Sequence, residues 1–338
     1  MLTFRHRTNR TDEGQRLDNV LNRWLPEAIG RPVSRSAVRR LVLAGEVVVG
    51  DRPVRRPGFL LAAGVRITAY VDPARITAAP DAEPAPEGLL DVLWEDEALI
   101  AVSKPAGLMV HRAADATRGD LFSLVQRLLG NRAGSTRPGG EPPYLALHHR
   151  LDRDTSGIVL FAKAREANGG LARQFGARTV RKTYLALAAA ARRPPGPEEW
   201  VVRNRLASIG TGRSSRMAAV PEGGEEAVTA FRILSWRGSA GLVAAHPVTG
   251  RKHQIRAHLA GCGLPIAGDG RYGGPTEIDR VPVGRTMLHA GRLELDHPVT
   301  GVPLAITCEL PEDFGGLLRA LGLDAGLDAG LTAARHPR

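Results

Sequence analysis

Cysteine is scarce in this chain of 338 residues, which contains only Cys262 and Cys308. Two cysteines argue against a disulfide framework of the kind found in small secreted domains, and they fit a reducing compartment. The sequence also lacks any stretch that approaches the roughly 20 apolar residues needed to cross a bilayer. Residues 1–7 lack the apolar core of a signal peptide. We therefore expect a soluble, cytoplasmic protein without a membrane partner, and we expect it to be a monomer.

Acidic residues are outnumbered by basic ones. The chain has 46 Lys and Arg against 35 Asp and Glu, a formal net charge of +11. Such an excess favours a polyanionic partner, most simply nucleic acid, although charge alone indicates only non-specific attraction. A chain of this length is also too long for one ordinary core, so the sequence predicts two domains.

Polar residues are concentrated in residues 148–156, directly before an apolar run that has the length of one buried strand. One interpretation is a surface loop whose arginines and aspartates pair with each other, and such exposed pairs contribute about 0–1 kcal/mol. The other is a functional site, because charge concentrated next to a buried strand is unusual unless a site requires it.

The order of the residues in this segment favours a site. Every fixed position of a known pattern is filled, by His149, Arg150, Leu151, Asp152, Thr155, Ser156 and Gly157. The segment resembles the signature of the RluA-type pseudouridine synthases, and a match of this length is specific. The resemblance implies an enzyme that isomerises uridine to pseudouridine in RNA, without a metal or an organic cofactor.

Three further segments resemble motifs of the same family. The first is the turn Lys104-Pro105-x-Gly107, which in the family helps to build the catalytic cleft. The second is Lys182-x-Tyr184-x-Ala186, whose tyrosine in the family stacks on the target base and takes part in proton transfer. The third is the segment 249–256, with the sequence Thr-Gly-Arg-Lys-His-Gln-Ile-Arg. The resemblance covers roughly residues 13–313.

Residues 13–72 have the pattern of a small separate module. Apolar residues recur at helical spacing over residues 17–25, a second helix is predicted from Ser34 to Gly45, and a short hairpin and a strand follow. Arg35 and Arg39 decorate the second helix. The module resembles the alpha-L RNA-binding domain first known from small-subunit ribosomal protein four, which implies contacts with the phosphates and shape of structured RNA.

The sequence therefore predicts an α+β protein with a small αα-β RNA-binding domain at residues 13–72. Residues 73–88 are rich in Pro and Ala and are predicted to be a linker. The resemblance places a mixed, largely antiparallel-sheet catalytic domain at residues 89–313. Residues 314–338 are expected to form a flexible tail.

Two other patterns are weaker. The letters Gly268-x-Gly270-x-x-Gly273 match a dinucleotide fingerprint, but no helix pattern follows them, so no nucleotide cofactor is expected. The spacing of His253, His258 and Cys262 matches no common zinc pattern, which favours structural histidines and no metal site.

The resemblance also implies roles for individual residues. Asp152, Tyr184 and Arg256 are the expected catalytic residues, with Asp152 as the nucleophile; Arg256 is its expected cationic partner and Arg251 the second choice. The uridine must be flipped out of folded RNA to be reached, at a cost of a few kcal/mol. The expected substrate-binding residues are Arg150, His149, Arg251, Arg35 and Arg39, with His149 expected mainly to fix the geometry of its own motif.

Three alternatives remain open from the sequence. A non-catalytic RNA-binding protein would use the same basic cleft, but a carboxylate facing phosphates would weaken its affinity. A retaining glycosidase would need a second carboxylate about 5 Å from Asp152. Large-subunit ribosomal RNA is the expected substrate, and transfer RNA is the alternative substrate.

Overall fold

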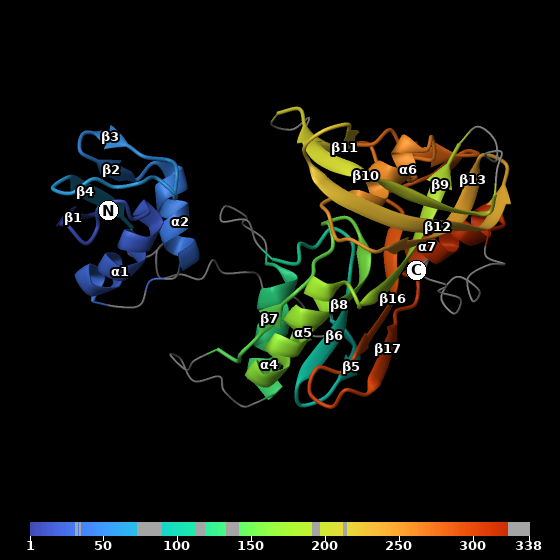
Figure 1. The fold of residues 1–338 in the computed structure, drawn as a ribbon, viewed down its shortest axis with the longest axis horizontal. Helices are drawn as coiled ribbons and strands as arrows, with labels where there is room; N and C mark the ends of the chain where they lie inside the picture. Colours follow the sequence, from blue (N-terminus) through green and yellow to red (C-terminus); the bar gives the residue numbers. More distant parts are fainter. Residues whose placement is uncertain are drawn as a thin grey trace. The chain divides into compact units, whose positions relative to one another are not determined.

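The structure is a computed structural model, shown as a ribbon in Figure 1. It describes residues 1–30, 33, 35–72, 90–111, 119–132, 142–190, 197–211 and 215–323, without the side chains of residues 35, 36, 39 and 40. The chain divides into two compact units whose main boundary lies between Glu87 and Gly88. The predicted linker, residues 73–88, lies outside the described residues.

The N-terminal unit combines two helices with a small antiparallel sheet. The helices are α1 (Leu17–Ile29) and α2 (Arg35–Ala44). The strands run in the order β1-β4-β2-β3, with bounds Leu2–Arg7 for β1, Arg66–Val71 for β4, Val47–Val49 for β2 and Arg52–Pro53 for β3. The apolar period of α1 buries Leu17, Val20, Leu21 and Leu25 in one core.

The first strand corrects the predicted start of this unit. We expected the module to begin at residue 13, yet β1 pairs along its whole length with β4, from Leu2 opposite Val71 to Arg7 opposite Arg66. Unpaired backbone groups at the edge of β4 would be costly, and β1 satisfies them. The unit therefore includes the first residues of the chain.

The C-terminal unit is built on one sheet of 11 strands, with the order β11-β10-β12-β13-β9-β16-β8-β6-β5; β17 pairs with β16, and β7 with β8. Among the strand pairs of the described residues, β16–β8 is the one parallel pair. The strands are β5 (Asp91–Glu95), β6 (Leu99–Lys104), β7 (Ala146–Leu147), β8 (Ser156–Ala162), β9 (Arg181–Ala189), β10 (Glu199–Ile209), β11 (Arg216–Val220), β12 (Glu225–Arg237), β13 (Ala240–Pro247), β16 (Leu288–Asp296) and β17 (Pro303–Thr307). Strands β14 (Glu277–Ile278) and β15 (Val281–Pro282) form a separate hairpin. The predicted α+β class with a largely antiparallel sheet is confirmed.

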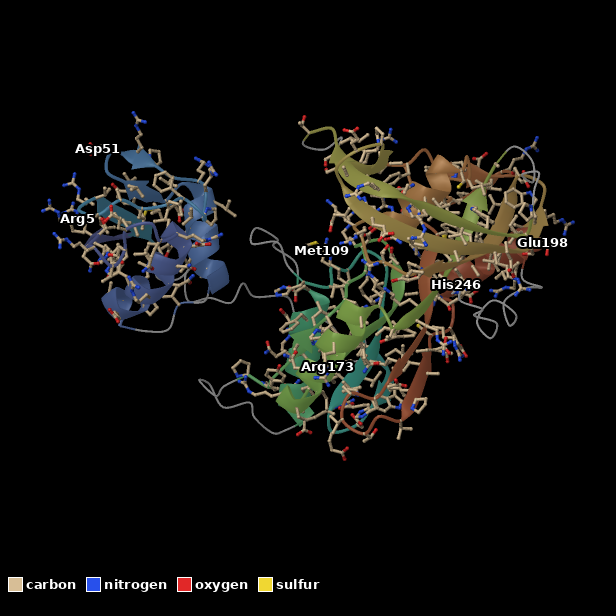
Figure 2. All side chains as sticks on the ribbon, viewed as in Figure 1. Arg5, Asp51, Met109, Arg173, Glu198 and His246 are labelled. Carbon is tan, nitrogen blue, oxygen red and sulfur yellow. The ribbon has the colours of Figure 1, made fainter. Side chains whose placement is uncertain are left out.

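Strand β8 carries the central motif and is buried on both faces. All seven of its residues are buried. Ile158 and Leu160 pack with α5 (Arg165–Ala177), whereas Val159 and Phe161 pack with α4 (Leu121–Arg132). Helix α5 keeps its opposite side in solvent, where Figure 2 labels the exposed Arg173. The continuous apolar run of β8 reflects this two-sided burial.

Gly157 allows β8 and β16 to approach closely. Its φ is +115°, and a Cβ at this position would lie 2.2 Å from the carbonyl oxygen of Ala290 on β16. Only glycine avoids both the strained backbone and this clash. The signature glycine is therefore required by the parallel pairing of β8 with β16.

Two helices complete this unit: α6 (Gln254–Gly261) and α7 (Glu312–Leu321). Helix α7 corrects the prediction of a tail from residue 314, because its side chains Phe314, Leu317 and Leu318 are buried in the core under β9 and β13. Gly315 and Gly316 lower the helix propensity here, and tertiary packing overrides it. Residues 324–338 of the predicted tail lie outside the described residues.

Candidate active site

A cleft of about 480 Å³ in the C-terminal unit brings together three segments that are distant in the sequence. They are the polar loop before β8, the start of β9, and the turn that leads from β13 into α6. Its lining includes the predicted residues His149, Arg150, Asp152, Tyr184, Arg251 and Arg256. The volume lies in the range of sites that enclose a small molecule or one nucleotide.

Lys104 fastens the loop that carries Asp152. Its side chain is fully buried, and Nζ donates hydrogen bonds to the carbonyl oxygens of Pro105, Leu108 and Arg153 at 2.9, 2.7 and 2.9 Å. Burial lowers the pKa of Lys104 to about 7, whereas three carbonyl acceptors favour the charged form. The Lys-Pro-x-Gly turn thus holds the loop that carries Asp152 directly.

His149 and Arg150 are neighbours with different surroundings. His149 Nε2 accepts the backbone N–H of Leu160 at 2.9 Å, and the ring stacks on Phe175 at 5.1 Å. Burial lowers the pKa of His149 to about 3, so the ring is neutral and serves the geometry of the loop. Arg150 is exposed at the cleft, and its guanidinium has no ion-pair partner in the described part of the chain.

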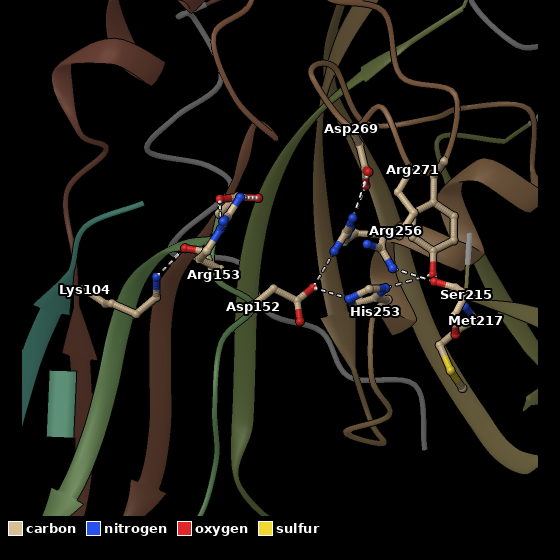
Figure 3. A network of polar contacts seen from close by, with 11 residues as sticks. Lys104, Asp152, Arg153, Ser215, Met217, His253, Arg256, Asp269 and Arg271 are labelled. Atoms are coloured by element: carbon tan, nitrogen blue, oxygen red, sulfur yellow. Dashed lines mark hydrogen bonds and ion pairs between the residues drawn. The ribbon is translucent and has the colours of Figure 1, made fainter. Parts of the chain in front are cut away.

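Asp152 belongs to a chain of three charged side chains. Arg256 Nη1 donates to Asp152 Oδ2 at 2.9 Å, and Arg256 Nε and Nη2 donate to Asp269 Oδ2 and Oδ1 at 2.6 and 2.8 Å (Figure 3). The side chains of Asp152, Arg256 and Asp269 are 27%, 11% and 1% exposed. Burial alone would lower the pKa of Arg256, but the two carboxylates raise it. Arg256 is therefore a permanent cation beside the Asp152 carboxylate.

Tyr184 lies on β9 at the wall of the cleft. The residue is half-buried and packs against two of the hydrophobic clusters of the unit. Burial raises the pKa of the Tyr184 phenol, and the nearby Asp152 carboxylate raises it further. Tyr184 is therefore protonated at neutral pH and presents a ring and an O–H donor to the cleft.

Arg251, the second predicted partner of Asp152, makes other contacts. Arg251 Nε donates to the carbonyl oxygen of Glu226 at 3.0 Å, and its guanidinium pairs with the Glu225 carboxylate. Arg251 thus lines the cleft but is held by β12, and Arg256 is the arginine that pairs with Asp152. Arg35 and Arg39 belong to α2 in the other unit, and their side chains lie outside the described part.

A buried polar network fixes the turn before α6. Gln254 Nε2 donates to the carbonyl oxygen of Val228 and to the Thr229 hydroxyl, both at 2.9 Å, and its Oε1 accepts from the Thr249 hydroxyl and the Arg251 N–H. Buried amides are stable only when bonded in this way. The signature letters of this segment therefore position the backbone that carries Arg256.

Sequence reasoning missed two groups beside Arg256. Asp269 was not recognised as its buried partner, although a carboxylate next to the apolar run 264–267 is the kind of signal that pointed to Asp152. The ring of Tyr272 lies under the Arg256 guanidinium, 5.0 Å from ring centre to Cζ, and no pattern in the sequence indicated it.

The described residues contain no group of His, Cys, Asp and Glu suited to hold a metal ion. His258 instead bonds the Thr229 hydroxyl at 2.9 Å and Asn204 Oδ1 at 3.1 Å, and Cys262 is exposed. The loop 268–273 leads into the short β14–β15 hairpin and not into a helix. In the part of the chain that the structure covers, every helix is too short or too polar to cross a membrane.

Comparisons with known proteins agree with this geometry. Residues 98–261 match the family model described as RNA pseudouridylate synthase, and residues 15–67 match the S4 domain. Ribosomal large subunit pseudouridine synthase D of Neisseria meningitidis serogroup B is 34% identical over 94% of this chain and 82% of the relative. Ribosomal large subunit pseudouridine synthase C of Escherichia coli strain K12 is 34% identical over 92% and 93%.

A solved structure supports the same assignment. Human RNA Pseudouridylate Synthase Domain Containing 4 is similar with a TM-score of 0.53 and 27% identity, over 68% of this chain and 92% of that one. The signature segments, the geometry around Asp152 and these similarities lead to one conclusion: the chain belongs to the RluA-type family of RNA pseudouridylate synthases and is an RNA pseudouridine synthase with an N-terminal S4 domain.

Proposed function

We propose that this enzyme converts specific uridines of large-subunit ribosomal RNA into pseudouridine, with Asp152 as the nucleophile. The observation that carries the proposal is the carboxylate of Asp152, partly exposed in the cleft and bonded to a cation that is itself fixed by the buried Asp269. The relatives named above act, by their names, on the large ribosomal subunit. A net charge of +11 and an S4 domain suit an RNA substrate.

The two oxygens of Asp152 are not equivalent. Arg256 contacts Oδ2, and His253 Nε2 lies 3.8 Å from the same atom. Oδ1 has no hydrogen-bond partner among the described residues, and Figure 3 shows dashed lines reaching only one oxygen of this carboxylate. Oδ1 is therefore the oxygen available to attack the substrate while Oδ2 stays neutralised.

The reaction needs no redox step. Asp152 Oδ1 forms an ester bond either to the ribose carbon C1′ or to C6 of uracil, and both routes use the same carboxylate. The N1–C1′ bond breaks, the base turns, C5 forms a bond to C1′, and the product then loses the C5 proton and gains a proton at N1. Regeneration of free Asp152 completes the cycle, so a single carboxylate suffices.

The neighbouring side chains have complementary roles in this proposal. The ring of Tyr184 stacks on the uracil, which stabilises a bound base by about 1–3 kcal/mol, and its O–H donates a hydrogen bond. Arg150, exposed and unpaired among the described side chains, supports the RNA from which the uridine has been flipped. Arg251 contributes positive charge at the rim, and Arg35 and Arg39 are proposed to contact RNA phosphates from the S4 domain.

We propose that the enzyme acts as a monomer. The scarcity of cysteine suits the reducing cytoplasm, and the proposed chemistry calls for no nucleotide cofactor.

The test is tritium release from RNA labelled at C5 of uracil, with the wild-type enzyme on ribosomal and transfer RNA of the same organism in parallel. Release from large-subunit ribosomal RNA alone supports the proposal. Release from transfer RNA alone would keep the enzyme class and overturn the substrate. No release from either RNA would overturn the substrate proposal and the proposed chemistry together.

A further inference from the structure

Four consecutive residues join the nucleophile to an edge strand of the sheet. Within residues 269–272, Asp269 pairs with Arg256, and Arg271 donates to the carbonyl oxygen of Ser215. The side chain of Tyr272 is buried, and its hydroxyl contacts both β11 and His253. The Tyr272 hydroxyl accepts the backbone N–H of Met217, on β11, at 2.9 Å and lies 3.1 Å from His253 Nδ1. Figure 3 shows this path from Met217 to Asp152.

The protons along this path can be assigned. A backbone N–H is always a donor, so the Tyr272 oxygen accepts from Met217. Among the described residues, the one acceptor for the hydroxyl proton is His253 Nδ1. An Nδ1 that accepts carries no proton, and a neutral imidazole then carries its proton on Nε2. The Met217 amide thus favours the tautomer of His253 that carries its proton on Nε2.

His253 is neutral in these surroundings. Burial lowers its pKa to about 4; Asp152 opposes this shift, and the positive Arg256, Lys252 and Arg271 add to it. Its Nε2–H points toward Asp152 Oδ2 across 3.8 Å, which is about 0.9 Å longer than a normal N–H···O bond. Such bonds are often long without substrate and shorten in the reactive complex.

The backbone of His253 supports a functional reading. Its φ of +53° lies in the left-handed region, which costs a non-glycine residue of this kind free energy and is found mostly at functional sites. This conformation places the imidazole immediately before α6 and beside the carboxylate of Asp152. The strain therefore serves the orientation of the ring.

We propose that His253 and Tyr272 are positioning residues for the nucleophile: the Tyr272 hydroxyl, fixed by the Met217 amide, orients an Nε2–H of His253 onto Asp152 Oδ2. Together with Arg256, this second donor keeps Oδ2 occupied and leaves Oδ1 to attack. The inference rests on the proposed role of Asp152, and it makes the position of β11 part of the catalytic geometry.

The first test is Tyr272→Phe, which removes the hydroxyl and keeps the ring under Arg256. We expect kcat to fall about tenfold, the effect of one lost oriented hydrogen bond, and KM for RNA to stay within about twofold. Tyr144→Phe is the matched control, because the Tyr144 ring also lies under an arginine, Arg165, at 4.7 Å. We expect this control to retain the wild-type rate.

The tautomer itself is measured by nitrogen-15 NMR on protein labelled at histidine. We expect His253 of the wild type to carry its proton on Nε2, and Tyr272→Phe to give a mixture of both tautomers. A proton on Nδ1 in the wild type, or an unchanged tautomer and unchanged kcat in Tyr272→Phe, would overturn the inference. This measurement does not depend on activity.

A second pair of variants controls for the backbone strain. His253→Gln keeps an N–H donor, whereas His253→Met has a similar length and no donor, and both meet the same positive φ. We expect kcat of the Gln variant within about threefold of wild type and that of the Met variant about tenfold lower. If His253→Gln and His253→Met have equal kcat values while Asp152→Asn is inactive, this inference alone is refuted. If Asp152→Asn is active, the proposed function is refuted.

Discussion

Removal of the Arg256 side chain isolates the buried charge of Asp269. In Arg256→Met, the Asp269 carboxylate, 1% exposed, loses two bonds of 2.6 and 2.8 Å. Removing one partner of a buried ion pair costs about 3–5 kcal/mol, because the remaining charge has neither water nor a counter-ion. We expect the free energy of unfolding to fall by about this amount and tritium release to be lost, since Asp152 loses its cation.

A second arginine supplies the control for burial. Arg285 donates to Asp313 through two nitrogens, at 2.5 and 2.9 Å, but the Asp313 side chain is 53% exposed. Arg285→Met should therefore cost about 1 kcal/mol or less, the magnitude of an exposed pair. Urea unfolding of the two variants compares the same bidentate geometry at different burial.

A double variant separates stability from catalysis. In Arg256→Met with Asp269→Asn, no charge is left unpaired in the buried position, so at least about 2 kcal/mol of the lost free energy should return. Activity should not return, because Asp152 still lacks its cation. Equal unfolding free energies for Arg256→Met and Arg285→Met, or activity in the double variant, would refute the reasoning.

Three further predictions concern the sheet, the pH dependence and the base. Gly157→Ala should prevent the pairing of β8 with β16, since its Cβ would lie 2.2 Å from the Ala290 carbonyl oxygen, and the soluble yield and thermal midpoint should fall sharply; a wild-type midpoint would contradict this. Burial lowers the pKa of His289 from 6.5 to about 4. As pH falls, the unfolded chain therefore binds a proton at this histidine before the folded chain does. The stability that His289 contributes is complete above pH 6.5 and is lost as pH falls toward 4. In urea titrations His289→Gln should reduce this slope by up to about 1.4 kcal/mol per pH unit, and an unchanged slope would argue against a buried neutral ring. Tyr184→Leu should lower kcat/KM by an amount equivalent to about 1–3 kcal/mol of transition-state free energy, while Tyr184→Phe keeps the stacking part. Equal losses in both variants would exclude stacking.

The sequence was sufficient for the parts of the site that lie within one segment. The apolar run after the motif predicted β8. The placement of Asp152 and Arg256 in one cleft came from the family resemblance, because the two residues are far apart in the sequence. These predictions worked because strand periodicity and the family pattern are both local properties of the chain. The same holds for α1, whose apolar period predicted its buried face.

The remainder depends on contacts between distant segments. The parallel pairing of β8 with β16 and the bond from Met217 to Tyr272 join residues far apart in the sequence, and no local pattern encodes them. Helix α7 was missed because its two glycines obscure a period that only tertiary packing makes stable. Arg251, the second predicted partner of Asp152, instead bonds Glu225 and Glu226 of β12, and no local pattern indicated this pairing.

The most direct test of the central claim compares Asp152→Asn with Asp154→Asn in single-turnover tritium release from large-subunit ribosomal RNA. Asp154 is the matched control, because it lies two residues away, is 43% exposed and pairs only with the neighbouring Arg153 among the described residues. We predict that Asp152→Asn binds the RNA but releases tritium at least about a thousandfold more slowly, while Asp154→Asn keeps the wild-type rate. A rate for Asp152→Asn within tenfold of wild type would contradict the assignment of Asp152 as the nucleophile.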